Sequence, residues 1–253
     1  MKTAKPRLAV AIFLATIFSL AAHAETTDAP AANENPPAEK SNDSEKPSKK
    51  SMSQEEEMEI SDFMMNYYKE PNLKKFDEMF RKILTVSAAH KGSSQPAIIF
   101  ISEVFRANPE KIADWEKVAE TLPSKEKTLA KIAKNFATEI ELGLDDMGPD
   151  MLWGAFFATG NNKFPAKVAA IAATISPKNV IDMTAAASAW SLASIAIDQK
   201  HTVALEAAKT YLETASPEER AAIAERLSEK NQQILLGEVL KKEEKETPPK
   251  TEK

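Results

Sequence analysis

Apolar residues recur along the middle of the chain at intervals of three and four, the spacing of one face of an α-helix. The stripe that follows Ser53 consists of Ile60, Phe63, Met64 and Tyr67. Ser53, with a glutamate three residues later, has the form of a capping box, which closes a helix N-terminus. The pattern therefore predicts an amphipathic helix that begins at Ser53.

Prolines and glycines divide the remainder into further helices, because proline is tolerated at the first helical position and glycine commonly follows the last. Gly143 is placed to end the fifth helix and Gly160 to end the sixth. Strands are not expected, because no useful length of chain alternates apolar and polar residues. We therefore predict an all-α domain. Its ten expected helices begin near residues 53, 72, 96, 109, 124, 149, 164, 179, 202 and 216.

The short connections predict antiparallel helical hairpins stacked side by side, a short α-solenoid. Prolines at 109 and 149, and again at 177 and 217, stand 40 residues apart, loosely the period of a two-helix repeat. The stretch 189–217 has the cadence of a tetratricopeptide unit but lacks its inter-helix glycine. The similarity therefore extends to hairpin packing and no further.

The N-terminus has the form of a cleavable secretory signal peptide over residues 1–24. Three basic residues within the first seven positions precede a 15-residue uncharged run, 8–22. Ala22 and Ala24 then match the A-x-A cleavage pattern. The run is shorter than the roughly 20 residues that span a membrane. We therefore expect export, with a mature chain that begins at Glu25.

Polar, low-hydrophobicity segments flank the predicted domain. Residues 25–53 lack Leu, Ile, Val and aromatic side chains and are rich in Pro, Glu, Lys and Ser. Such a segment buries too little apolar surface to offset chain entropy, so we predict a disordered linker; a tether to peptidoglycan or the membrane surface is the alternative. A second disordered, charged tail is predicted at 241–253. The folded domain is then 54–240.

Composition and charge exclude several classes of function. The chain has 6 glycines, no cysteine and a net charge of −5, and loss of the signal's three basic residues leaves the mature chain at −8. An acidic surface does not neutralise nucleic-acid phosphate. The absence of cysteine excludes disulfides and a lipid-modified N-terminus. The most apolar later segment, 181–197, contains Asp182 and many small residues, so we expect a buried helix there and not a transmembrane span.

Residues suited to chemistry are few. His90 and His201 are the histidines left after cleavage, and neither lies in a known catalytic motif. Asp145, Asp146 and Asp150 crowd one turn but fit a helix N-terminus better than a calcium loop. We therefore expect no cofactor and no metal, and an enzyme is not favoured. Methionine core filler is expected, in preference to a copper site, at four positions: Met58, Met64, Met65 and Met79.

Aromatic residues concentrate at one point of the chain. Trp153 and Phe157 belong to the short apolar run 151–158, which favours a buried core helix, with an anchor pocket for a partner peptide as the alternative. Phe164 follows at what the sequence indicates is an exposed turn. Trp153, Phe157 and Phe164 are therefore the candidate partner-binding residues. Trp115 and Trp190 are expected in the core.

Three stretches together resemble a known group of proteins. They are YYKEP around Tyr67 and Pro71, PAIIFISEVFRANPEKIADW at 96–115, and DMLWGAFFATG at 150–160. The pattern is similar to that of exported bacterial all-helical proteins of unassigned function that look like tetratricopeptide-type α-solenoids. The resemblance covers about 53–175. It implies the fold and carries no catalytic motif.

Together these features predict an exported cell-envelope protein, most simply periplasmic, that acts as a non-catalytic protein- or peptide-binding or scaffolding module. Stacked helical hairpins generally present extended surfaces to other proteins. The alternatives are a carboxylate-based envelope enzyme, for example one that acts on glycans, and a secreted effector. The expected partner is another protein or peptide of the envelope, not nucleic acid.

Overall fold

The structure is a computed structural model that describes residues 53–89, 94–174 and 183–246. The predicted signal peptide and almost all of the predicted linker lie outside the described residues. Within them the chain is all-α, with eleven α-helices and no strand. The predicted fold class is therefore confirmed.

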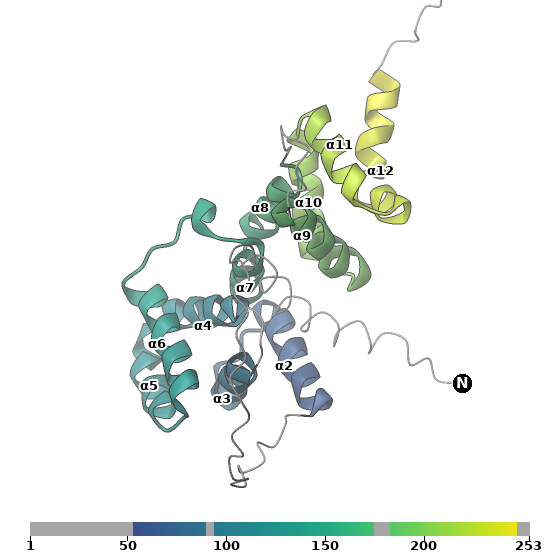
Figure 1. The fold of residues 1–253 in the computed structure, drawn as a ribbon. Coiled ribbons are helices and arrows are strands. Elements are labelled where there is room, and N and C mark those ends of the chain that lie inside the picture. The colour runs from purple at the N-terminus through teal and green to yellow at the C-terminus, as the bar shows by residue number, and fades with distance from the viewer. Residues whose placement is uncertain (1–52, 90–93, 175–182, 247–253) are drawn as a thin grey trace, which may run out of the picture.

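The helices follow one another with short connections (Figure 1). Short 3-10 segments, η2 (Tyr67–Lys69), η3 (Pro109–Lys111) and η4 (Leu144–Asp146), lie between some of them. The α-helices are α2 (Gln54–Asn66), α3 (Leu73–Ala89), α4 (Gln95–Ala107), α5 (Ile112–Glu120), α6 (Ser124–Thr138), α7 (Pro149–Thr159), α8 (Lys163–Ala172), α9 (Met183–Leu192), α10 (Thr202–Thr214), α11 (Pro217–Arg226) and α12 (Glu229–Glu246).

The central element of the N-terminal half is α4. Most of its residues are apolar and buried, because α6 and α7 pack against it and α3 also touches it. Gly154 of α7 lies against the backbone of Pro96, at the start of α4, and a side chain at this glycine would meet that backbone. The close approach of α4 and α7 therefore requires glycine at this position.

The C-terminal half is built around α8, which packs against α7, α9 and α10. Residues 179–182 of the helix predicted over 179–198 lie outside the described residues; the remainder is α9 continued by a π-helix, η5 (Ala193–Asp198). In Figure 1, α7 and α8 lie between the α2–α6 body and the α9–α12 body. One continuous hydrophobic core nevertheless runs from Ile60 to Leu236.

Local signals place several helix ends where the sequence predicts them. The Ser53 capping box is present, with the Ser53 backbone N–H donating to Glu56 Oε2 at 2.9 Å. Gly160 ends α7 at φ +67°, the left-handed conformation that favours glycine. Proline heads α7 and α11 as expected. Neighbouring helices pack as α5 with α6, α8 with α9, and α11 with α12. The closer likeness to tetratricopeptide repeats stays a prediction.

Three local predictions were wrong. Helix α6 ends at Thr138 and not at Gly143, because Glu139 leaves the helical conformation and Ile140 is exposed, which ends the apolar stripe. The last predicted helix is two, α11 and α12, separated at Leu227 and Ser228. Helix α12 continues to Glu246, so the first part of the predicted disordered tail is helical. Among the described residues, we find no helix with the length and apolar character needed to cross a membrane.

Candidate functional site

The three predicted partner-binding aromatics are all in the core. Trp153 is fully buried, and its indole N–H donates to Ser191 Oγ at 2.9 Å. Phe157 is also buried. The expectation that Phe164 lies on an exposed turn was wrong: α8 already begins at Lys163, and the Phe164 side chain is 4% exposed. These residues hold α7 and α8 in place and do not offer a surface to a partner.

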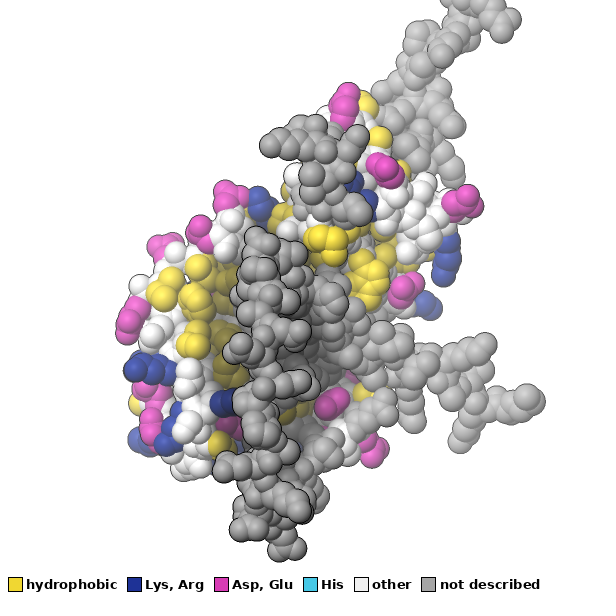
Figure 2. Space-filling model, viewed as in Figure 1, with side chains coloured by type: hydrophobic (Ala, Val, Ile, Leu, Met, Phe, Trp, Pro, Cys, Tyr) yellow, Lys and Arg dark blue, Asp and Glu magenta, His cyan; other side chains and the backbone are white. Residues whose placement is uncertain are grey.

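The other two tryptophans differ from each other. Trp115 is buried, as predicted, whereas Trp190 is 40% exposed and so is not a core residue. Trp190 lies seven residues after Met183, on the same face of α9, and Met183 is also exposed. Figure 2 shows hydrophobic side chains gathered over the region of α9 and α10.

His201 sits in an aromatic cage made by Tyr68, Phe156 and Phe157, with ring centroids 5.3–5.9 Å away. Its Nε2 lies 3.2 Å from the Met65 carbonyl oxygen, which accepts only, so Nε2 carries the proton and donates. Nδ1 then accepts from the Tyr68 hydroxyl at 3.4 Å. Burial lowers the pKa of His201. The residue is a neutral structural link between the N-terminus of α10 and the end of α2.

The clustered aspartates have separate roles. Asp145 forms an ion pair with Lys167, and Asp146 Oδ2 accepts from the Gly143 backbone N–H at 2.9 Å. Asp150 lies in the first turn of α7, as predicted, where burial raises its pKa to about 6. Across the described ranges, no group of three or more His, Asp or Glu side chains is placed to hold a metal ion.

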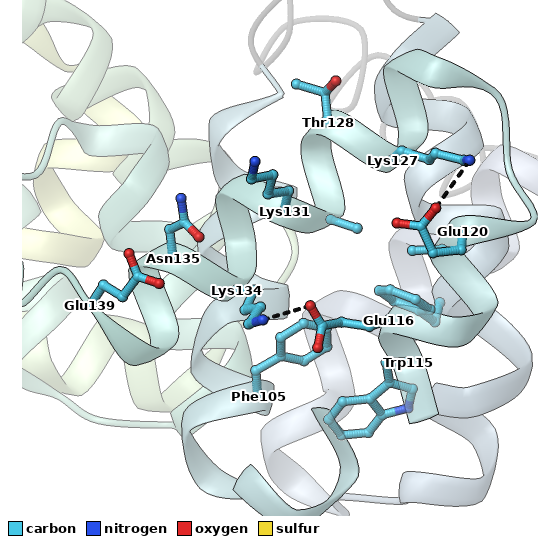
Figure 3. A pocket seen from close by; sticks show the side chains of 13 residues that line it. Phe105, Trp115, Glu116, Glu120, Lys127, Thr128, Lys131, Lys134, Asn135 and Glu139 are labelled. Carbon is cyan, nitrogen blue, oxygen red and sulfur yellow. Dashed lines mark hydrogen bonds and ion pairs between the residues drawn. The ribbon is translucent and has the colours of Figure 1, made fainter. Parts of the chain in front are cut away.

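Among the residues that the structure describes, the feature best suited to bind a ligand is a groove between α5 and α6, with a volume of about 410 Å³. Helix α5 provides an acidic wall with Glu116 and Glu120. Helix α6 provides a basic wall with Lys127, Lys131 and Lys134. Figure 3 shows the two walls facing each other across the opening.

Buried apolar side chains form the floor of this groove. Phe105 and Trp115 stack with ring centroids 4.8 Å apart and planes within 6° of parallel, and Phe76 packs edge-on against Trp115 at 5.0 Å. The Trp115 indole N–H donates to Asp77 Oδ1 at 2.6 Å, which fixes the ring orientation. These contacts hold the Phe105 and Trp115 rings in one orientation beneath the groove.

Two ion pairs connect the walls. Lys134 Nζ lies 2.6 Å from Glu116 Oε1, and Lys127 Nζ lies 3.2 Å from Glu120 Oε2 (Figure 3). The hydrogen bond from Lys134 to Glu116 raises the pKa of Lys134. Lys131 lies between these two lysines on the same helix. With respect to the described chain, Lys131 forms no ion pair and is exposed.

The sequence carries a signal for this groove, although no single motif contains it. Lys127, Lys131 and Lys134 follow the i, i+4, i+7 spacing of one helix face, and Glu116 and Glu120 follow the i, i+4 spacing. Each row alone resembles an ordinary solvated helix face. Only the pairing of α5 with α6 brings the two rows together.

Comparison with known protein families, with curated proteins and with solved structures finds no match to this chain. The groove must therefore be interpreted from its own geometry and charge.

Proposed function

We propose that the protein is a non-catalytic binding module of the bacterial cell envelope, exported to the periplasm, that holds a segment of another protein in the α5–α6 groove. The observation that carries this proposal is the groove itself: a cavity of about 410 Å³ with a floor of stacked aromatic rings and charged walls of opposite sign. Its size falls in the range of ligand pockets, roughly 300–1,000 Å³.

The balance of charge in the groove supports a protein ligand over nucleic acid. Three lysines and three glutamates line it, the third glutamate being Glu139. Nucleic-acid sites need a surplus of positive charge to displace counterions from phosphate. Figure 2 likewise shows acidic and basic side chains interspersed over the region of α5 and α6. A surface of this kind matches another protein surface of mixed charge.

The groove lacks the arrangement that a carboxylate-based hydrolase requires. Such enzymes place a carboxylic acid with a raised pKa and a second carboxylate on opposite sides of the substrate. The carboxyl with the raised pKa, Asp150, does not line the groove, and neither does the buried Glu126. Glu116 and Glu120 are already paired with lysines. The geometry therefore favours binding over catalysis.

Site-specific photocrosslinking in the native cell tests the proposal. A photoreactive amino acid replaces Thr128, an exposed groove residue, and in a control strain it replaces Thr210, an exposed residue of α10. We expect one protein adduct that forms at position 128, is absent at position 210, and is recovered from the periplasmic fraction. An adduct of equal yield at both positions, or none at either, would refute the groove as the binding site.

Mass spectrometry of the purified mature chain tests export in the same preparation. We expect an N-terminus at Glu25. An intact Met1, or recovery of the protein mainly from the cytoplasm, would contradict the envelope location. Recovery from the culture medium would favour a secreted effector in its place.

A further inference from the structure

One side of α9 is exposed to solvent and carries no charge. This side, the α9 face, follows the i, i+3, i+4, i+7 spacing of a single helix surface and consists of Met183, Ala186, Ala187 and Trp190. The whole stretch 183–197 contains no charged residue, whereas the neighbouring α10 exposes glutamates. Another surface can therefore cover the α9 face without removing any of its charge from water.

Two large side chains project from the α9 face. Met183 is 61% exposed and Trp190 is 40% exposed, the largest exposed fractions of hydrophobic side chains on α9. Tryptophan is enriched among the residues that dominate binding at protein interfaces. Figure 2 shows the apolar surface of this region open to solvent. The composition and exposure of the α9 face are therefore those of an interface.

The relief of the α9 face suits a second helix that crosses it. Ala186 and Ala187 lie at its centre, and Met183 and Trp190 lie on either side, each about 5 Å from the centre along the helix axis. Two helices that cross at an angle are closest at the crossing point and diverge away from it. Alanines at the centre allow the close approach, and the two large side chains fill the widening gap.

This relief is also symmetric in the way that a second copy of the same helix requires. A two-fold axis that passes between Ala186 and Ala187 relates antiparallel copies of α9 and places Met183 of each copy level with Trp190 of the other. Such self-complementary pairing defines an isologous interface. The contact is favourable, because a methionine sulfur packs well against an aromatic ring. An unrelated partner would require no such symmetry.

Charge favours the antiparallel arrangement as well. The chain has a net charge of −5, so two copies repel each other unless they meet at an uncharged surface. The nearest charge after the α9 face is the exposed Asp198. In antiparallel copies the two Asp198 residues stand about 35 Å apart along the helix axis. This distance exceeds the screening length of about 8 Å, whereas parallel copies would place the two carboxylates level with each other.

We infer that the α9 face is a homodimer interface, in which two copies of the chain pair antiparallel about an axis between Ala186 and Ala187. One helix face is smaller than the roughly 800 Å² per partner of a standard stable complex, so the dimer is weak, with a dissociation constant on the order of 100 µM. The inference is independent of the α5–α6 groove, which belongs to the other body in Figure 1. The dimer carries two such grooves.

Disulfide crosslinking tests this arrangement directly, because the chain has no cysteine of its own. Oxidation of purified Ala187→Cys should give a linked dimer on a non-reducing gel, since the two copies of position 187 meet beside the axis. Met183→Cys should give far less, because its two copies stand about 10 Å apart along the axis and a disulfide needs Cα atoms within about 7 Å. Thr210→Cys, at an exposed position of α10, is the control for random collision.

Sedimentation equilibrium of the mature chain measures the dissociation constant. Met183→Glu should raise it at least tenfold, because pairing would bury a carboxylate in each copy. Trp190→Ala should have a similar effect through loss of the aromatic anchor. The matched control Ile140→Ala also removes an exposed hydrophobic side chain, but outside α9, and should leave the dissociation constant unchanged. Circular dichroism confirms that each variant keeps its helical content.

The contrary outcomes are equally specific. A wild-type chain that stays monomeric up to about 1 mM would overturn the inference. A dimer that is unaffected by both Met183→Glu and Trp190→Ala would place the interface elsewhere, and equal crosslinking at positions 183 and 187 would overturn the antiparallel arrangement. A monomer whose Trp190 fluorescence shifts on addition of phosphatidylcholine vesicles would assign the face to a membrane surface. The photocrosslinking result at Thr128 stands apart from all of these.

Discussion

The partly buried carboxyl of Asp150 provides a quantitative test of the structure through the variant Asp150→Asn. Asp150 lies in the first turn of α7, beside residues packed into the core, and burial raises its pKa from 3.8 to about 6. Burial has this effect because it disfavours the charged form. Asparagine has nearly the same shape and stays neutral at every pH.

The direction of the pH dependence follows from the raised pKa. The folded chain binds the Asp150 proton more tightly than the unfolded chain does, so the protonated carboxyl stabilises the fold. This contribution to the free energy of unfolding is fully present below pH 3.8 and is lost as the pH rises through about 6. A shift of about two pH units corresponds to about 3 kcal/mol. The dipole at the N-terminus of α7 favours the ionised form by about 0.3–1 kcal/mol. We therefore expect a net cost of about 2 kcal/mol at neutral pH.

Urea denaturation followed by circular dichroism, repeated across the pH range, measures this effect. Asp150→Asn should be about 2 kcal/mol more stable than the wild type above about pH 7 and of nearly equal stability at about pH 4. Subtracting the wild-type stability from that of Asp150→Asn at each pH removes the contributions of all other titrating groups, which the two proteins share. The control Asp62→Asn makes the same substitution at an exposed aspartate of α2. A variant less stable than the wild type at neutral pH would refute the reasoning, since the carboxylate would then make a stabilising contact.

Three further predictions concern packing and protonation. Gly154→Ala should destabilise the fold by about 1–3 kcal/mol in urea denaturation, because its new methyl group meets the backbone of α4, while Gly148→Ala, which meets nothing, should change stability by less than about 1 kcal/mol. Iodide should quench the fluorescence of Trp190 and not that of the buried Trp153; equal quenching in single-tryptophan variants would contradict the burial of α7. In NMR spectra His201 should titrate below its usual pKa, because burial disfavours its charged form. Its contribution to stability is therefore present above about pH 6.5 and is lost on acidification. Titration at the usual pKa would instead place the ring in solvent.

The sequence predicted the helices best where their ends carry strong local signals. Ser53 and Ser216 begin helices through capping boxes, and Gly160 ends α7 in the left-handed conformation. These signals act through the backbone of a few neighbouring residues, so they work without the rest of the fold. The end of α6 was missed because Ile140 fits the apolar spacing but has no core to pack against.

Exposure of individual aromatics was harder to predict. Phe164 and Trp190 were assigned the wrong way round, with Phe164 buried and Trp190 exposed. A hydrophobic side chain follows the same helical spacing whether or not another helix covers it. The way α8 packs against α9 decides which face of each helix is buried. The apolar spacing within one helix does not show which other helix will cover it.

The sequence by itself determined the class of this protein: a chain without cysteine, poor in glycine and patterned at helical spacing folds into helices whose ends its capping residues mark. The tertiary structure alone decided the candidate site. Glu116 and Lys134 are 18 residues apart, and each belongs to a row of charges that resembles a solvated surface. The rows become the two walls of one groove because α5 and α6 pack against each other over Phe105 and Trp115. Charge spacing is local, but the pairing of helices depends on burial of the whole core.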